Sequence, residues 1–126
     1  QRGAIAGLKI KDEWFPEVFN LQRENQKNVY NMVSKLEGFE IPIYPSNGNF
    51  LIIEINDEEV KPEAICSIFA KSKILVRQGS YHTKKFGDKF IKVSLSVPKK
   101  WTDEFITLFP STVKKARGIN VTNNLY

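Results

Sequence analysis

The sequence predicts an α/β (α+β) domain in which helices cover a small mixed β-sheet, with a long helix near the start of the chain. Three observations predict this fold. Residues 90–98 alternate apolar and polar side chains, residues 49–55 form a nearly continuous apolar run, and apolar residues recur at helical spacing around these two segments. Helices and strands that alternate along a chain favour an α/β layer. At 126 residues the chain is long enough for one domain with a buried core.

The N-terminal part of the chain predicts helix. Residues 1–9 are rich in small residues and helical in character apart from two glycines, so they indicate the end of a further element. From Asp12 to Leu36 the apolar positions fall at helical spacing, interrupted by a polar stretch with Gln22, Arg23 and Gln26. We expect one long helix that ends at Gly38 and buries only its two ends deeply.

The following segment predicts two strands. Residues 39–44 alternate but contain Pro42, which restricts any strand there to a sheet edge. Residues 45–48 (PSNG) have the composition of a turn. The apolar run 49–55 then predicts a central strand that is covered on both faces.

A helix and a short strand come next. Pro62 opens a helix to Lys71, and its buried stripe consists of Ala64, Ile65, Ile68 and Phe69. Cys66 lies off this stripe, and we interpret it as structural because no neighbour in the sequence would depress its pKa. Residues 74–78 predict a short strand that ends at Gly79.

The loop 79–89 contains Tyr81 and the only histidine of the chain, His82. Loops often carry functional residues, so both are site candidates, although a single loop histidine is more often simply exposed.

The last helix is predicted from an apolar stripe formed by Trp101, Phe105, Leu108 and Phe109, with Pro110 as a kink or break. Residues 119–126 predict a flexible tail. No repeat or linker divides the chain, so we expect a single domain over residues 1–118.

The strand 90–98 carries the strongest site candidate. Ile91, Val93 and Leu95 point to one face, whereas Lys92 lies on the other face among small hydroxyl side chains. Two interpretations are open. Lys92 is a solvated residue of an open face, as lysine usually is, or it binds an anion. The choice depends on what surrounds the strand.

Composition limits the classes of protein. The chain is 41% hydrophobic and 26% charged, which is typical of globular proteins, and no apolar run is long enough to span a bilayer. One cysteine and one histidine exclude a cysteine and histidine metal site, and the lone cysteine fits a reducing, cytoplasmic compartment. The net charge of +5 permits nucleic-acid binding, but the cations are spread along the chain rather than clustered.

Three segments, taken in order, resemble a known family. They are PSNGNFL at 45–51, ILVRQGS at 74–80 and FIKVSL at 90–95. In order and spacing they resemble the C-terminal small domain of class I/II, fold-type I pyridoxal-phosphate aminotransferases, in particular the aspartate and histidinol-phosphate aminotransferases. The resemblance covers nearly the whole chain, from the long helix with Arg23 to the final helix.

The resemblance implies a function in transamination between an amino acid and a 2-oxo acid. In this family the small domain closes over the active site, and an arginine in the strand that matches 90–98 binds the substrate carboxylate. The large domain, absent from this chain, holds pyridoxal phosphate through a lysine, and the full-length enzyme is expected to form a homodimer. Aligned residue by residue, the arginine position is Lys92. Arg77 is the nearest cation that could assist it, with an exposed surface arginine as the alternative, and Asn49, Tyr81 and His82 are candidate active-site loop residues.

The sequence departs from the family in two respects. Lysine offers a point charge where arginine offers a planar fork, so Lys92 should attract a carboxylate but orient it less firmly. The family's serine-lysine pair followed by glycine and arginine is also missing, since Ser34-Lys35 and Ser72-Lys73 lie near predicted helix ends. We therefore expect no catalytic or cofactor-binding residue in this chain, which should be inactive alone. Because it begins at Gln1 rather than methionine, we expect a fragment of a longer polypeptide.

Two alternatives stay open. The first is the small domain of a pyridoxal-phosphate-dependent decarboxylase or lyase of the same fold, which would not consume 2-oxoglutarate. The second is a basic module that binds nucleic acid. It is disfavoured because the aromatic residues Trp101, Phe105 and Phe109 fit a buried helix stripe rather than a surface for stacking bases.

Overall fold

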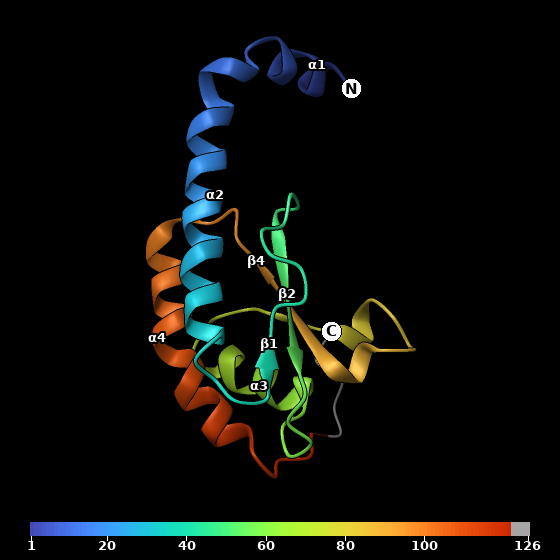
Figure 1. Cartoon of the computed structure of the whole chain (residues 1–126). Helices are drawn as coiled ribbons and strands as arrows, with labels where there is room; N and C mark the ends of the chain where they lie inside the picture. The colour runs from blue at the N-terminus through green and yellow to red at the C-terminus, as the bar shows by residue number, and fades with distance from the viewer. Residues whose placement is uncertain (122–126) are drawn as a thin grey trace.

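The computed structural model describes residues 1–121. Its helices are α1 (Arg2–Lys9), α2 (Lys11–Val33), α3 (Pro62–Lys71) and α4 (Lys99–Ala116). Its strands are β1 (Phe39–Glu40), β2 (Phe50–Ile55), β3 (Arg77–Gln78) and β4 (Phe90–Ser94), and two short 3₁₀ turns, η1 (Gly79–Tyr81) and η2 (Gly87–Lys89), lie between β3 and β4. Helices beside one small sheet confirm the predicted mixture of α and β structure (Figure 1).

The sheet is antiparallel throughout, so the predicted mixed sheet is wrong. Its strand order is β1-β2-β4-β3, and each neighbouring pair is antiparallel. A strand, a crossover helix and a further strand favour a parallel orientation, and β2 and β3 do run in the same direction because both are antiparallel to β4. They form no parallel pair because β4 lies between them.

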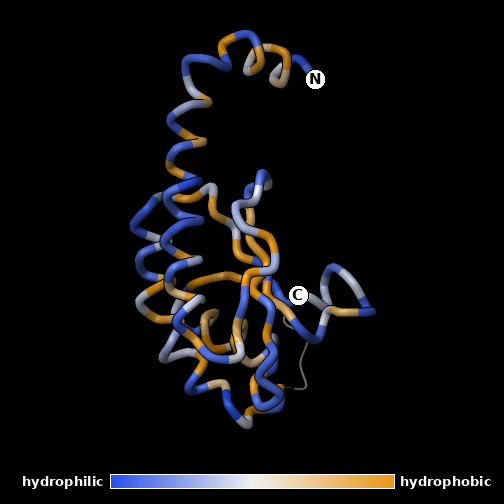
Figure 2. The backbone as a smooth tube through the Cα atoms, in the orientation of Figure 1, coloured by the Kyte–Doolittle hydropathy of each residue, from blue (hydrophilic) through white to orange (hydrophobic). Residues whose placement is uncertain are grey.

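The helices cover one face of this sheet. The core combines the inward side chains of β2 and β4 with residues of α2, α3 and α4, and these inward residues are Leu51, Ile53, Ile55, Ile91 and Val93. On the other face Phe50, Ile52 and Phe90 are only partly buried. The prediction that the central strand is covered on both faces is therefore wrong for this chain, whose second face is open and carries partly exposed apolar side chains beside charged ones. In Figure 2 apolar segments lie in the sheet and on the helices beside it, and others lie along α1 and the first half of α2.

The long helix is confirmed, but the prediction that its polar centre is shallow is wrong. Asn25 and Gln26 are completely buried, whereas residues 11–20 are exposed along their whole length. The helix ends at Val33, and Gly38 lies in the turn that follows with a φ of 80°. A polar helix centre is buried here because its amides replace water as hydrogen-bond partners of loop backbone.

Four side chains of this centre, Gln22, Arg23, Asn25 and Gln26, form what we name the polar clamp. The Asn25 amide donates to the carbonyls of Leu95 and Val97, both at 3.0 Å. Gln26 donates to the Ser46 carbonyl at 2.8 Å and accepts from the Ser46 N–H at 3.1 Å. Gln22 and Arg23 donate to the same turn, to the carbonyls of Gly48 and Ser46. The clamp therefore fixes the entry to β2 and the exit from β4.

The remaining elements agree only in part with expectation. The helix at 62–71 has the predicted bounds. Cys66 was predicted off its buried stripe, but the structure buries it, which raises the pKa of its thiol to about 12 and fits a structural role. Helix α4 continues through Pro110 without a break. Trp101 was expected in its buried stripe, but the side chain is 56% exposed.

The expected strand 74–78 is reduced to Arg77–Gln78. Most of the predicted tail, residues 122–126, lies outside the described residues.

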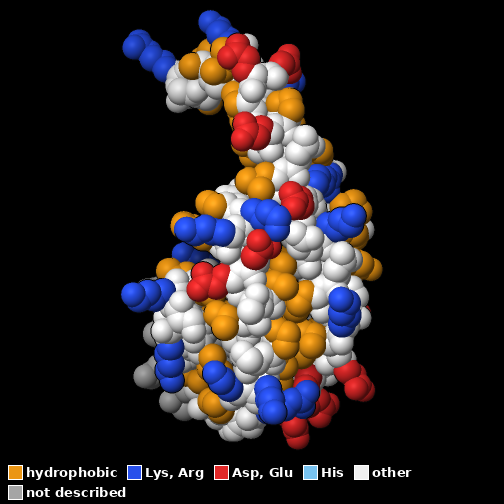
Figure 3. Space-filling view, turned by 90° about the vertical axis from the view of Figure 1, so that its left-hand side faces the viewer, with side chains coloured by type: hydrophobic (Ala, Val, Ile, Leu, Met, Phe, Trp, Pro, Cys, Tyr) orange, Lys and Arg blue, Asp and Glu red, His pale blue; other side chains and the backbone are white. Residues whose placement is uncertain are grey.

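Helix α1 and the first half of α2 form an arm that extends away from the body of the domain (Figure 3). Several large apolar side chains of the arm are exposed, namely Ile5, Leu8, Ile10, Trp14, Phe15, Val18 and Phe19. Apolar side chains exposed in such number on one arm are typical of a contact with another domain or chain. Within residues 1–121 no helix has both the length and the apolar character needed to cross a membrane.

We predict that the isolated chain self-associates through this arm, because its apolar side chains lose contact with water on association. Changing Phe15 to glutamate should shift the chain toward monomer in sedimentation velocity runs. Ile43→Glu is the matched control, since Ile43 is 71% exposed but lies outside the arm. A monomer over a wide range of concentration for the unmodified chain would contradict the prediction.

Candidate functional site

Lys92 lies at the centre of β4 and on the open face of the sheet. Its neighbours Ile91 and Val93 are buried against the helices, so alternation turns Lys92 to the other side. Its ammonium nitrogen lies 4.3 Å from the centre of the Phe50 ring, on the adjacent strand β2. Such a contact favours a cation without neutralising it. Phe50 was not singled out from the sequence, although its parity with Ile52 in the predicted strand places it on this face.

Arg77 lies directly beside Lys92. The two residues are paired in the register between β3 and β4, and the Arg77 guanidinium lies 4.4 Å from the centre of the Tyr81 ring. Directly opposed like charges destabilise a sheet. The pair therefore provides a positive site at which a bound anion would relieve repulsion.

Two glycines fold the loop that carries Tyr81 and His82. A Cβ atom on Gly79 would lie 2.6 Å from the Gly87 carbonyl oxygen, and one on Gly87 would lie 2.4 Å from the Ser80 Cα. Only glycine permits this approach of the two ends of the loop. The approach packs η1 against η2 and sets Tyr81 beside Arg77.

His82 completes the cluster. Its ring packs edge-on against the Tyr81 ring, with 5.1 Å between the two ring centres. Partial desolvation and, next in size, the positive charges of Lys92 and Arg77 lower the pKa of His82. Desolvation is the larger cause, and the smaller contributions of Lys92 and Arg77 show that both cations lie near the imidazole.

No carboxylate among the described residues pairs with Lys92 or Arg77. The ion pairs of residues 1–121 involve Lys99 and Arg117 instead, far along the chain on α4 and after it. The described part of the chain also contains no cluster of three metal-binding side chains. We name one cluster the cation site, after its two cationic side chains; it consists of Lys92, Arg77, Tyr81, His82 and Phe50. The cluster is therefore suited to binding an anion.

Asn49 does not belong to the cation site. Its carbonyl accepts the N–H of Leu95 at 2.9 Å, and Leu95 follows the end of β4, three residues and thus about 10 Å along the extended chain from Lys92. The structure therefore brings together four of the five candidates from the sequence, and leaves Asn49 outside the cluster, at the residue before β2 begins.

The described residues do not fit pyridoxal phosphate. That cofactor needs a lysine for covalent attachment beside groups that bind its phosphate. Lys92 faces an aromatic ring and a second cation on an open surface, and Lys73, which lines a hollow beside α4, lies among apolar side chains. We assign no step of cofactor chemistry to this chain.

Comparison with protein-family models gave no match, and no curated protein sequence is significantly similar to the chain.

Proposed function

We propose that this chain is the small domain of a pyridoxal-phosphate-dependent aminotransferase, and that its cation site binds the substrate carboxylate. The observation that supports this proposal is the pairing of Lys92 with Arg77 on the open face without a carboxylate partner in residues 1–121. A carboxylate at this position would be held by two cations, and the second cation makes up for the weaker orientation that lysine alone gives.

The open face also supports a second domain. Phe50, Ile52 and Phe90 are partly exposed on it around Lys92. A large domain that covers this face would bury these side chains and exclude water from the cation site, which strengthens charge interactions there. The exposed arm would pack on the same domain. The cofactor and its lysine would belong to that large domain, in a cytoplasmic homodimeric enzyme.

The test of the function is an assay of the full-length polypeptide with pyridoxal phosphate, a set of α-amino acids and 2-oxoglutarate. The proposal expects glutamate to form in equal amount to the 2-oxo acid produced. Release of carbon dioxide or ammonia without consumption of 2-oxoglutarate would instead identify the decarboxylase or lyase alternative. If neither the amino acid nor 2-oxoglutarate is consumed, both the aminotransferase proposal and the decarboxylase or lyase alternative are contradicted.

A further prediction concerns the chain alone, which should take up no cofactor at a defined lysine. The reason is the lack of a lysine beside phosphate-binding groups among the described residues. After incubation with pyridoxal phosphate and reduction with borohydride, mass spectrometry should show only scattered labelling of lysines. A single lysine labelled in equal proportion to the protein would place the cofactor site in this chain.

A further inference from the structure

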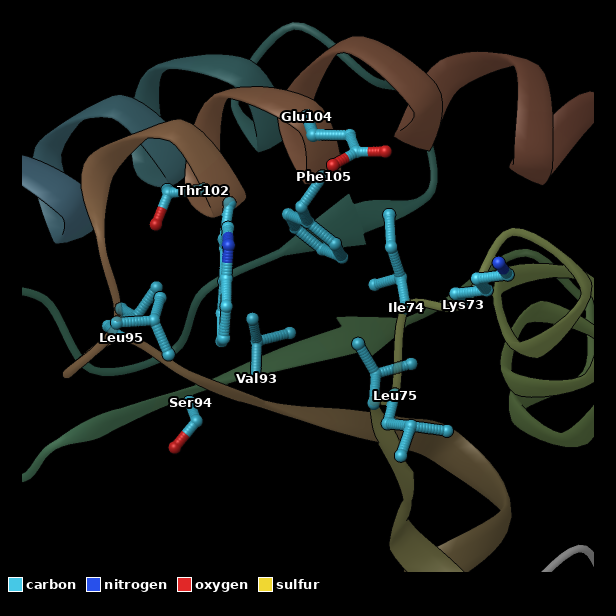
Figure 4. Close-up of a pocket in the computed structure, with 12 residues that line it drawn as sticks. Lys73, Ile74, Leu75, Val93, Ser94, Leu95, Thr102, Glu104 and Phe105 are labelled. Atoms are coloured by element: carbon cyan, nitrogen blue, oxygen red, sulfur yellow. The ribbon is translucent and has the colours of Figure 1, made fainter.

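A cleft of about 340 Å³ lies on the helix-covered side of the sheet, between α4, β4 and residues 73–76 (Figure 4). Its walls are mostly apolar, formed by Ile74, Leu75, Val93, Trp101 and Phe105 among others. A volume of this size is within the range of small-molecule sites.

The cleft exists because β3 is short. If the pairing between β3 and β4 continued for two residues before Arg77, Leu75 would lie opposite Ser94. Residues 74–76 instead form no strand, and Leu75 is 79% exposed. Between the end of α3 and the start of β3 the chain therefore runs apart from β4, and α4 bounds the gap between them.

Lys73, at the edge of the cleft, has a backbone conformation that lysine rarely adopts. Its φ is 61°, at the position after α3 where the Ile74 N–H bonds to the Phe69 carbonyl and the Lys73 N–H to the Ala70 carbonyl. Glycine is the usual residue in this helix-ending motif. A lysine there costs about 1 kcal/mol relative to glycine.

Charges of both signs lie at the edge of the cleft. Lys73 comes from the segment after α3, and Glu104 comes from α4. Neither side chain forms a hydrogen bond or ion pair within residues 1–121. A third polar group, the Thr102 hydroxyl, lines the cleft, is 2% exposed and has no hydrogen-bond partner in the described part of the chain.

We propose that this cleft binds a small zwitterion with a large apolar body, of the size of an apolar dipeptide. Its carboxylate would meet Lys73, its ammonium would meet Glu104, and its side chains would lie between Trp101 and Phe105. The charge pattern supports this class, because a simple anion would face Glu104 and a simple cation would face Lys73. Nothing in the proposed aminotransferase function requires this second site.

The test uses the chain of 126 residues and three matched probes: the dipeptide Leu-Phe, its C-terminal amide and its N-acetyl derivative. Binding is measured by NMR titration of the ¹⁵N-labelled chain. Leu-Phe should shift the amides of residues 73–76 and of Ser94 in a saturable manner. Lys73→Gly should weaken the binding of Leu-Phe about three- to tenfold and leave the binding of the amide probe within about twofold. Glu104→Gln should likewise weaken the binding of Leu-Phe and leave the binding of the N-acetyl probe within about twofold.

Stability gives an independent measurement. Lys73→Gly should raise the free energy of unfolding, because glycine relieves the left-handed strain, so weaker binding could not be attributed to a damaged fold. Lys114→Ala, an exposed lysine of α4 outside both the cleft and the cation site, is the control and should leave Leu-Phe binding unchanged. No saturable shift with Leu-Phe, or equal loss of all three probes in both cleft variants, would overturn the proposal.

Discussion

Changing Lys92 to alanine in the full-length polypeptide is expected to lower kcat/KM for the amino acid about 10- to 150-fold. The reason is the loss of a charge-assisted contact with the substrate carboxylate, which is worth roughly 1.5 to 3 kcal/mol. Cofactor absorbance should not change, because this chain does not hold the cofactor. Steady-state kinetics with parallel measurement of cofactor absorbance checks the prediction.

Two variants sharpen this result. Lys92→Arg should restore or improve kcat/KM if the site has the family's usual shape, since a planar fork binds a carboxylate with two hydrogen bonds. Lys89→Ala removes an exposed lysine three residues away in η2 and should have little effect. Unchanged kinetics in Lys92→Ala at full cofactor occupancy would return Lys92 to the role of a solvated residue.

Changing Asn25 to alanine is expected to destabilise the chain by about 2 to 4 kcal/mol. The substitution leaves the Leu95 and Val97 carbonyls without their donor in a buried place, and each unsatisfied group costs roughly 1 to 3 kcal/mol. The free energy of unfolding in urea gives the measurement. Asn31→Ala on the exposed side of the same helix is the control, with a change within about 0.5 kcal/mol. Equal effects in the two variants would show that the polar clamp is not needed for stability.

Local patterns in the sequence predicted the elements well where one periodicity dominated. The alternation around Lys92 and the apolar stripe of residues 62–71 gave a strand and a helix at the expected places. Short pieces were less predictable. Residues 74–78 have strand composition, but the left-handed turn at Lys73 directs them away from β4, and this turn depends on the end of α3 rather than on their own residues.

Errors in the packing have a common physical origin, because burial depends on partners distant in the sequence. The polar centre of α2 appeared shallow because the partners of Asn25 and Gln26, the carbonyls near Leu95 and Ser46, lie 20 to 70 residues away. Trp101 appeared buried because it shares the spacing of Phe105, yet it lies in the first turn of α4 beside the cleft.

The cation site was predictable in part. Lys92 was chosen from the alternation of its strand, and its role and the choice of Arg77 came from the resemblance. Their pairing follows only from the order of strands, since β4 lies between β2 and β3. Tyr81 and His82 were chosen as loop residues, and the approach of Gly79 to Gly87 that directs them to Arg77 is a tertiary feature. Asn49 was chosen from the segment 45–51, and the structure places it before the start of β2 and outside the site.

A crystal structure of the full-length polypeptide with a bound carboxylate analogue of an amino acid substrate tests the central claim most directly. The proposal predicts a second domain over the open face of the sheet, with the carboxylate about 2.7 to 2.9 Å from the Lys92 ammonium nitrogen and near Arg77. An open face in solvent, with the carboxylate held by residues elsewhere, would contradict it.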